Sequence, residues 1–142
     1  MNWARFAMTV AAAGVAASVT DWFFMGVLFH GKYLETPEMW RRPRPSASLR
    51  TGGSEGETRA IVLSALVSVI SCAVIVYLCE RIHMHTYSQS LKLAVAMWVA
   101  AVPILATFSI WTKYHPMLAV SHSLGWLARF VLSAVAATLL MH

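Results

Sequence analysis

Four long runs of apolar residues, separated by polar stretches, dominate the pattern of the chain. They cover about residues 6–29, 60–78, 91–111 and 117–141. A helix crosses the hydrocarbon core of a bilayer with about 20 predominantly apolar residues, and each run is long enough for this. The sequence therefore predicts an all-α fold, an integral membrane bundle of four transmembrane helices that forms a single domain over residues 1–142.

The longest polar stretch, residues 30–59, follows the first apolar run and is predicted to be a basic loop. Thr36-Pro37-Glu38 is typical of a helix start, with a capping residue before a proline. We expect a short interfacial helix over residues 36–42 and a flexible linker over residues 43–58. The central arginines face either solvent or anionic lipid headgroups, and they are Arg41, Arg42 and Arg44.

The composition excludes most other classes of protein. Only 12% of the 142 residues are charged and 58% are hydrophobic, whereas soluble domains carry about 25% charged residues. A soluble fold of this length cannot bury so much apolar surface, which argues against a soluble enzyme, a disordered chain and a nucleic-acid binder. The first run is also longer than the apolar core of a signal peptide, so we expect an uncleaved helix.

The net charge of +5 comes mainly from basic residues in the loops. Three basic residues, Arg5, Arg81 and Lys92, fall on the membrane face of the termini, and seven fall on the other face: Lys32, Arg41, Arg42, Arg44, Arg50, Arg59 and Lys113. Since Lys and Arg are enriched in cytoplasmic loops, we expect the long loop in the cytoplasm and both termini outside, in the inner membrane of a bacterium.

Small residues at helical spacing predict where the helices pack closely. One stripe contains Ala13, Ala17 and Asp21 with Gly14 and Ser18 beside it, and a second stripe follows in the next helix: Ala60, Ser64, Ser68 and Cys72. In the third helix, Pro103 is expected to introduce a kink. Thr107, one turn later, is expected to satisfy the backbone group that the proline frees.

Away from the ends of the predicted spans, charged residues occur at two positions, Asp21 and Arg129. Arg129 lies about 18 Å into the fourth span, His122 about 7 Å into it, and Asp21 about 12 Å from the loop end of the first. His122, Trp126, Arg129, Ser133 and Ala137 share one helix face. We expect the first and fourth helices to be neighbours and Asp21 to pair with Arg129, His122 or both, for a structural or a functional purpose.

A second group of chemically active residues follows the second span, in the sequence Cys79-Glu80-Arg81-Ile82-His83-Met84-His85. Thiolate, imidazole and thioether ligands suit copper or zinc. The group lacks a standard zinc spacing, so Cys79, His83 and His85 are only an alternative metal site, and no cofactor is otherwise expected. The sequence contains no nucleophile with a base, no P-loop and no dinucleotide fingerprint, and therefore no catalytic residue is predicted.

The end of the first span reads Trp22-Phe23-Phe24, then Leu28-Phe29-His30-Gly31-Lys32, and the third span carries Trp98 and Pro103. With this combination the chain resembles the small bacterial membrane proteins grouped as domain of unknown function family 1761. The resemblance covers most of the chain outside the basic loop. It implies a fold and a membrane location, and it assigns no role to Asp21, Arg129 or the histidine cluster.

These observations favour a non-catalytic, multi-pass membrane protein surrounded by the lipid bilayer, which assembles with copies of itself or serves as an accessory subunit of a membrane complex. One alternative is a small transporter or channel that uses Asp21, His122 and Arg129 around the kink at Pro103. Another is a metal-handling protein that uses His83 and His85. A transporter predicts a water-accessible cavity at Asp21, whereas a scaffold predicts a dry, packed ion pair.

Overall fold

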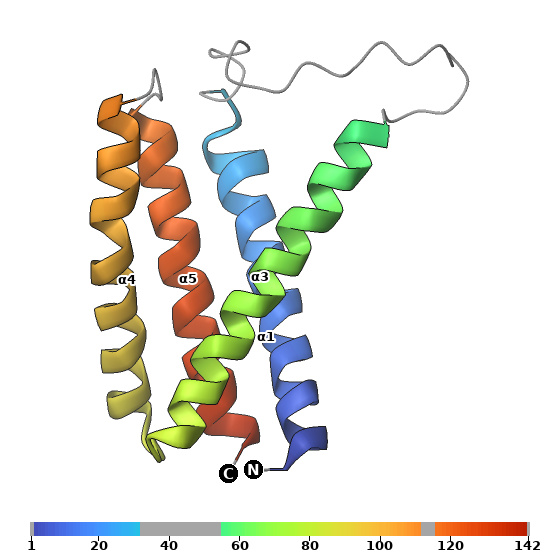
Figure 1. The fold of residues 1–142 in the computed structure, drawn as a ribbon, viewed down its shortest axis with the longest axis vertical. Coiled ribbons are helices and arrows are strands. Elements are labelled where there is room, and N and C mark those ends of the chain that lie inside the picture. The colour runs from blue at the N-terminus through green and yellow to red at the C-terminus, as the bar shows by residue number, and fades with distance from the viewer. Residues whose placement is uncertain (1, 32–54, 112–115, 142) are drawn as a thin grey trace.

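The computed structural model describes residues 2–31, 55–111 and 116–141. Four helices long and apolar enough to cross a membrane make up this part of the chain, and it contains no strand. In chain order the elements are α1 (Trp3–Trp22), the π-helix η1 (Phe23–Leu28), α3 (Glu55–Arg81), α4 (Tyr87–Trp111) and α5 (Pro116–Leu140). The prediction of an all-α bundle of four membrane-spanning helices is confirmed (Figure 1).

The helix that contains the second span begins before the apolar run predicted for it. We expected loop and linker to continue to residues 58 and 59, but α3 already begins at Glu55. The sequence around this point has the spacing of a capping box, with Ser54 three residues before Glu57, and this pattern favours a helix start. The polar first turn of α3 therefore precedes the apolar segment Ile61–Arg81.

The helices alternate in direction along the chain (Figure 1). The start of α1 and the end of α5 lie at one end of the bundle, and the end of α1 and the start of α3 lie at the other. The described ends of the chain therefore lie at the same end of the bundle, as four alternating helices require.

The bundle is built around α5, which contacts α1, α3 and α4. Its buried residues lie along one face, where Leu118, Ser121, Gly125, Arg129, Ser133 and Ala137 recur at steps of three and four and Ala134 lies beside them. The predicted face is buried at Arg129, Ser133 and Ala137, whereas His122 and Trp126 are only half-buried. In this first half of α5 the interior positions include Ser121 and Gly125.

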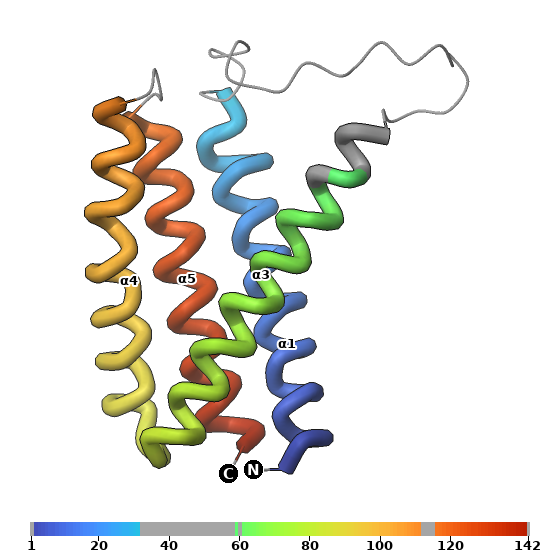
Figure 2. The backbone as a smooth tube through the Cα atoms, viewed as in Figure 1, coloured from blue at the N-terminus to red at the C-terminus, as the bar shows by residue number. Residues whose placement is uncertain are grey.

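The crossing of α3 over α1 divides α3 into a packed half and an unpacked half (Figure 2). Residues 61–67 are all exposed, and Ser68 is the first buried residue among those described in α3. The predicted stripe on this helix is thus buried at Ser68 and Cys72 and exposed at Ser64. On α1 the predicted stripe is buried at Ala13, Gly14 and Ala17, whereas Ser18 beside it is exposed.

Pro103 lies inside α4, which passes through it as one continuous helix. Thr107 Oγ1 donates a hydrogen bond to the carbonyl of Pro103 at 2.8 Å. The carbonyl that a helical proline leaves without its partner is that of the residue four positions earlier, here Val99. The expectation that Thr107 satisfies the freed backbone group is therefore wrong.

Candidate functional site

The predicted ion pair between the first and last helices is present in the interior of the bundle. Asp21 stands in the last turn of α1, directly before η1, and Arg129 stands near the middle of α5. Arg129 Nη2 donates to Asp21 Oδ2, and the two side chains are 9% and 18% exposed, respectively. A charged residue at this depth of a membrane protein faces the protein interior or a partner charge, and this pair meets both conditions.

A third helix contributes to the same carboxylate. Ser68 of α3 donates from Oγ to Asp21 Oδ2 at 3.4 Å. Asp21 Oδ2 therefore accepts from residues on α3 and α5, and the cluster joins three of the four helices. The sequence placed Ser68 in a packing stripe and missed this role, because the period of a stripe does not say which of its members meets a charge.

Gly125 explains how the carboxylate comes so close to α5. A Cβ atom at this position would lie 3.0 Å from Asp21 Oδ1, a tighter contact than most Cβ atoms make, so the carboxylate would have to shift. Gly125 is one turn before Arg129 on the buried face of α5. The glycine thus makes space for Asp21, and the arginine one turn later supplies the opposite charge.

Hydrogen-bonding capacity remains unused in this region. Asp21 Oδ1, Arg129 Nε and Ser121 Oγ are buried, and none of the three has a hydrogen-bond partner in the described part of the chain. An unpaired buried polar group destabilises a fold by about 1–3 kcal/mol. Asp21 Oδ1 is an acceptor and Arg129 Nε a donor within the ion pair, and the Ser121 hydroxyl, able to act as either, lies two turns earlier on the buried face of α5.

His122 is the remaining member of the predicted cluster. It is half-buried on α5 and lies within electrostatic range of both Asp21 and Arg129. Of the three residues predicted from the sequence, Asp21 and Arg129 form an ion pair, and His122 lies two turns before Arg129 on α5.

The alternative metal site is not assembled as the sequence suggested. Cys79 is 2% exposed and packs in the main hydrophobic cluster with Met84 and Met141, whereas His83 and His85 are exposed on the turn that follows α3. No group of three His, Cys, Asp or Glu side chains able to hold a metal ion occurs within residues 2–31, 55–111 and 116–141. Cys79 is therefore separated from the histidines by burial.

The basic-loop arginines Arg41, Arg42 and Arg44, and the interfacial helix expected over residues 36–42, lie outside the described residues.

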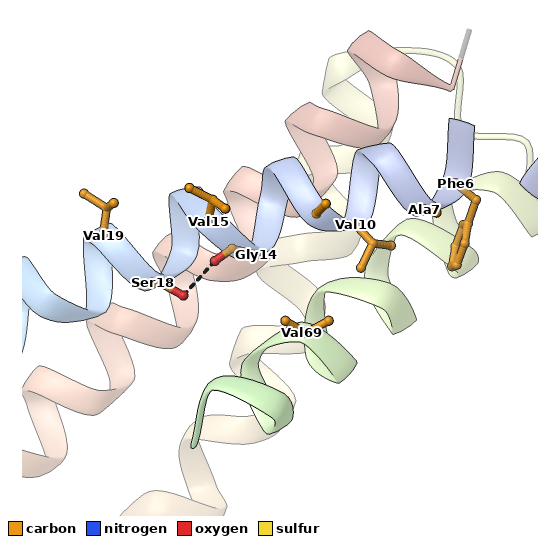
Figure 3. Close-up of a pocket in the computed structure, with 9 residues that line it drawn as sticks. Phe6, Ala7, Val10, Gly14, Val15, Ser18, Val19 and Val69 are labelled. Atoms are coloured by element: carbon orange, nitrogen blue, oxygen red, sulfur yellow. Dashed lines mark hydrogen bonds between the residues drawn. The ribbon is translucent and has the colours of Figure 1, made fainter. Parts of the chain in front are cut away.

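An apolar groove of about 700 Å³ runs along α1 from Phe6 to Val19, with Val69 of α3 opposite (Figure 3). Its serine, Ser18, donates to the carbonyl of Gly14 at 2.8 Å, so the groove presents a surface for apolar contact.

Comparisons of the chain with family models, with curated proteins and with solved structures find no match. The resemblance to domain of unknown function family 1761 therefore stays a prediction. The inference of function depends on the geometry of the cluster and on the surface that the four helices present to the bilayer.

Proposed function

We propose that the protein is a non-catalytic component of a membrane, in which the pair of Asp21 and Arg129 fixes the arrangement of the helices. The observation that carries this proposal is the packed state of the pair, whose side chains are 18% and 9% exposed and closed onto each other. A dry ion pair is what a structural role requires, because water in the site would weaken the attraction between the charges.

The position of the pair supports a role in helix register. Asp21 Oδ2 is held by α3 through Ser68 and by α5 through Arg129. A shift of α1 or α5 by one turn would separate the two charges in an apolar environment, which is unfavourable by several kcal/mol. The ion pair therefore selects one relative placement of α1 and α5, and the weaker bond from Ser68 adds α3 to it.

The outer surface supports a role in assembly. Residues 61–67 of α3 and most of α4 present large apolar side chains outward, among them Ile61, Leu66, Ile104 and Ile110. We propose that copies of this chain, or other subunits of a bacterial inner-membrane complex, share this surface with lipid. In this proposal the long loop is cytoplasmic and the termini are outside.

Replacement of the whole pair by apolar residues tests the structural role. Asp21→Leu combined with Arg129→Met removes both charges at once, and such replacements in protein interiors are often neutral or stabilising. We expect the double variant to fold and to keep the wild-type assembly by native mass spectrometry, whereas each single variant loses stability. A double variant that folds normally but loses its assembly or its function in cells would contradict a purely structural pair.

A second candidate is a small transporter or channel that uses the same cluster. The specific observation in its favour is the unused hydrogen-bonding capacity at Asp21 Oδ1, Arg129 Nε and Ser121 Oγ. Proton flux into proteoliposomes that enclose a pH-sensitive dye distinguishes the two candidates. Flux that disappears in Asp21→Asn and persists in Lys92→Gln, a change on the exposed surface of α4, would favour transport over the structural role.

A further inference from the structure

The turn between α3 and α4 holds two histidines in a defined geometry. At the end of α3, the N–H of Met84 donates to the carbonyl of Cys79 at 2.9 Å, and the N–H of His83 donates to the carbonyl of Glu80 at 3.2 Å. These two bonds form a Schellman motif, which places Met84 against the helix end and makes His83 the residue that reverses the chain. The turn is therefore anchored by backbone bonds on both sides of His83.

His83 adopts a conformation that is usual for glycine. Its φ is 54°, and it is the one non-glycine residue with positive φ in the described chain. The residue at this position of a Schellman motif is most often glycine, because a Cβ atom is strained in the left-handed region. A non-glycine residue held in this region is a reason to look for a function of its side chain.

The side chain of His83 lies beside that of His85. The ring centroids are 5.9 Å apart, and both residues are exposed. With metal–nitrogen bonds of about 2.0–2.1 Å, two imidazoles bound to one ion have ring centroids roughly 5–6.5 Å apart. The observed separation falls in this range, so both rings can bind a single ion after rotation about their side-chain bonds.

We infer that His83 and His85 form a two-imidazole binding site for one divalent transition-metal ion at the α3–α4 turn. Imidazole ligands suit Cu²⁺, Ni²⁺ and Zn²⁺. The neighbouring sulfur atoms do not belong to the site, because Cys79, Met84 and Met141 pack in the hydrophobic cluster beneath the turn. The exposed rings leave the other coordination positions of the ion to water.

This site is separate from the cluster of Asp21 and Arg129 and goes beyond the proposed function. It lies between the spans that end at Arg81 and begin at Tyr87, at the end of the bundle that also holds the start of α1 and the end of α5 (Figure 1). The Asp21→Leu/Arg129→Met variant is therefore expected to bind metal as the wild type does, which separates a failure of one proposal from a failure of the other.

Calorimetric titration of the full, tag-free chain in detergent micelles tests the inference. We expect one Cu²⁺ ion per chain, weaker binding of Ni²⁺ and Zn²⁺ in keeping with the usual order of affinities, and no binding of Mg²⁺. His85→Ala is expected to abolish the Cu²⁺ isotherm. His30→Ala, which removes an exposed histidine at the other end of the bundle, is the matched control and is expected to bind as the wild type does.

Substitutions at His83 separate the ligand from the backbone. Glycine and asparagine both tolerate the left-handed conformation, so His83→Gly and His83→Asn remove the imidazole and keep the turn. We expect both variants to lose Cu²⁺ binding and to unfold at a temperature no lower than that of the wild type. Undiminished binding in these variants and in His85→Ala, or equal binding of Mg²⁺, would overturn the inference.

Discussion

Helices α4 and α5 have the same length of 25 residues and opposite relations to the bundle. The more apolar of the two, α4, is the least buried of the four spans and buries only Ser90 and Ala94 among the described residues. The more polar helix, α5, is the most buried and carries Arg129, Ser121 and Ser133 on its interior face. Hydrophobicity therefore does not select the central helix of this protein.

The difference follows from the bilayer as solvent. Lipid tails are as apolar as leucine, so an apolar helix gains little by moving from lipid into protein. A polar or charged side chain, by contrast, finds partners only inside the bundle. Arg129 and the serines of α5 are satisfied only when this helix is central. Helix α4 packs against α5 with one face, and its other faces are exposed.

The largest expected difference between the helices concerns charge. Arg129→Leu leaves Asp21 buried without its partner, and loss of one member of a buried pair destabilises by about 3–5 kcal/mol. Lys92→Leu on α4 removes an exposed charge and is expected to change stability by less than about 0.5 kcal/mol. Reversible unfolding in mixed detergent micelles measures both, and equal losses would show that depth of burial does not govern the effect.

Apolar side chains sharpen the same comparison. Leu118 on α5 is 2% exposed and Ile104 on α4 is 69% exposed. We expect Leu118→Ala to lower the free energy of unfolding by about 2–5 kcal/mol through the cavity that it creates. Ile104→Ala removes a side chain that lies outside the protein core, and its free energy of unfolding is expected to stay within about 0.5 kcal/mol of the wild type. A large loss for Ile104→Ala would indicate that a partner covers α4.

Glycines test the close approach of α1 and α5. In Gly125→Ala the new Cβ meets Asp21 Oδ1 at 3.0 Å. Overpacking of this kind destabilises by about 1–3 kcal/mol, which exceeds the gain of up to about 1 kcal/mol for alanine over glycine in a helix. The control is Gly26→Ala, where the nearest atoms, in the ring of Trp22, are at an ordinary 3.4 Å. Thermal unfolding is expected to rank Gly125→Ala well below Gly26→Ala, and the reverse order would exclude contact at Gly125.

The smallest expected effect concerns the bond that ties α4 to α5. Trp98 Nε1 donates to the carbonyl of Ser123 at 2.9 Å and to its hydroxyl at 3.1 Å. Trp98→Phe removes this donor, and we expect a loss of about 1 kcal/mol in the free energy of unfolding. The matched control is Trp111→Phe, because Trp111 is the last residue of α4 and is 84% exposed. Similar values for both variants would mean that α4 is held by packing alone.

Much of the fold follows from the length and spacing of apolar runs. The four spans, their alternating direction and the common end of the termini need only the thickness of a bilayer and an even number of crossings. The start of α3 at Glu55 was missed, because hydrophobicity locates the apolar part of a helix and gives no information about its polar first turn. The π-helix after Trp22 was also missed, since its residues carry no signal that separates it from an α-helix.

The two charged residues of the site were predicted from the sequence, but the neutral residues that contact Asp21 were not. Asp21 and Arg129 could be matched from depth alone, because opposite charges inside a membrane seek each other. Ser68 and Gly125 belong to the site through the crossing of α3 over α1 and through the rotation of α5, and neither can be read from one helix at a time. His83 was noted for its chemistry, but its left-handed backbone follows from the Schellman turn.

The sequence by itself determined that this is a membrane protein, where its four spans lie and which two charges lie inside them. These features depend only on side-chain polarity and on distance along a helix. Only the tertiary structure decided that α5 is central and α4 peripheral, that Gly125 admits Asp21, and that residues 61–67 leave the bundle. These features depend on the angles and contacts between helices. In a bilayer, van der Waals packing of small residues and interhelical polar contacts set those angles together, and neither can be read from one helix alone.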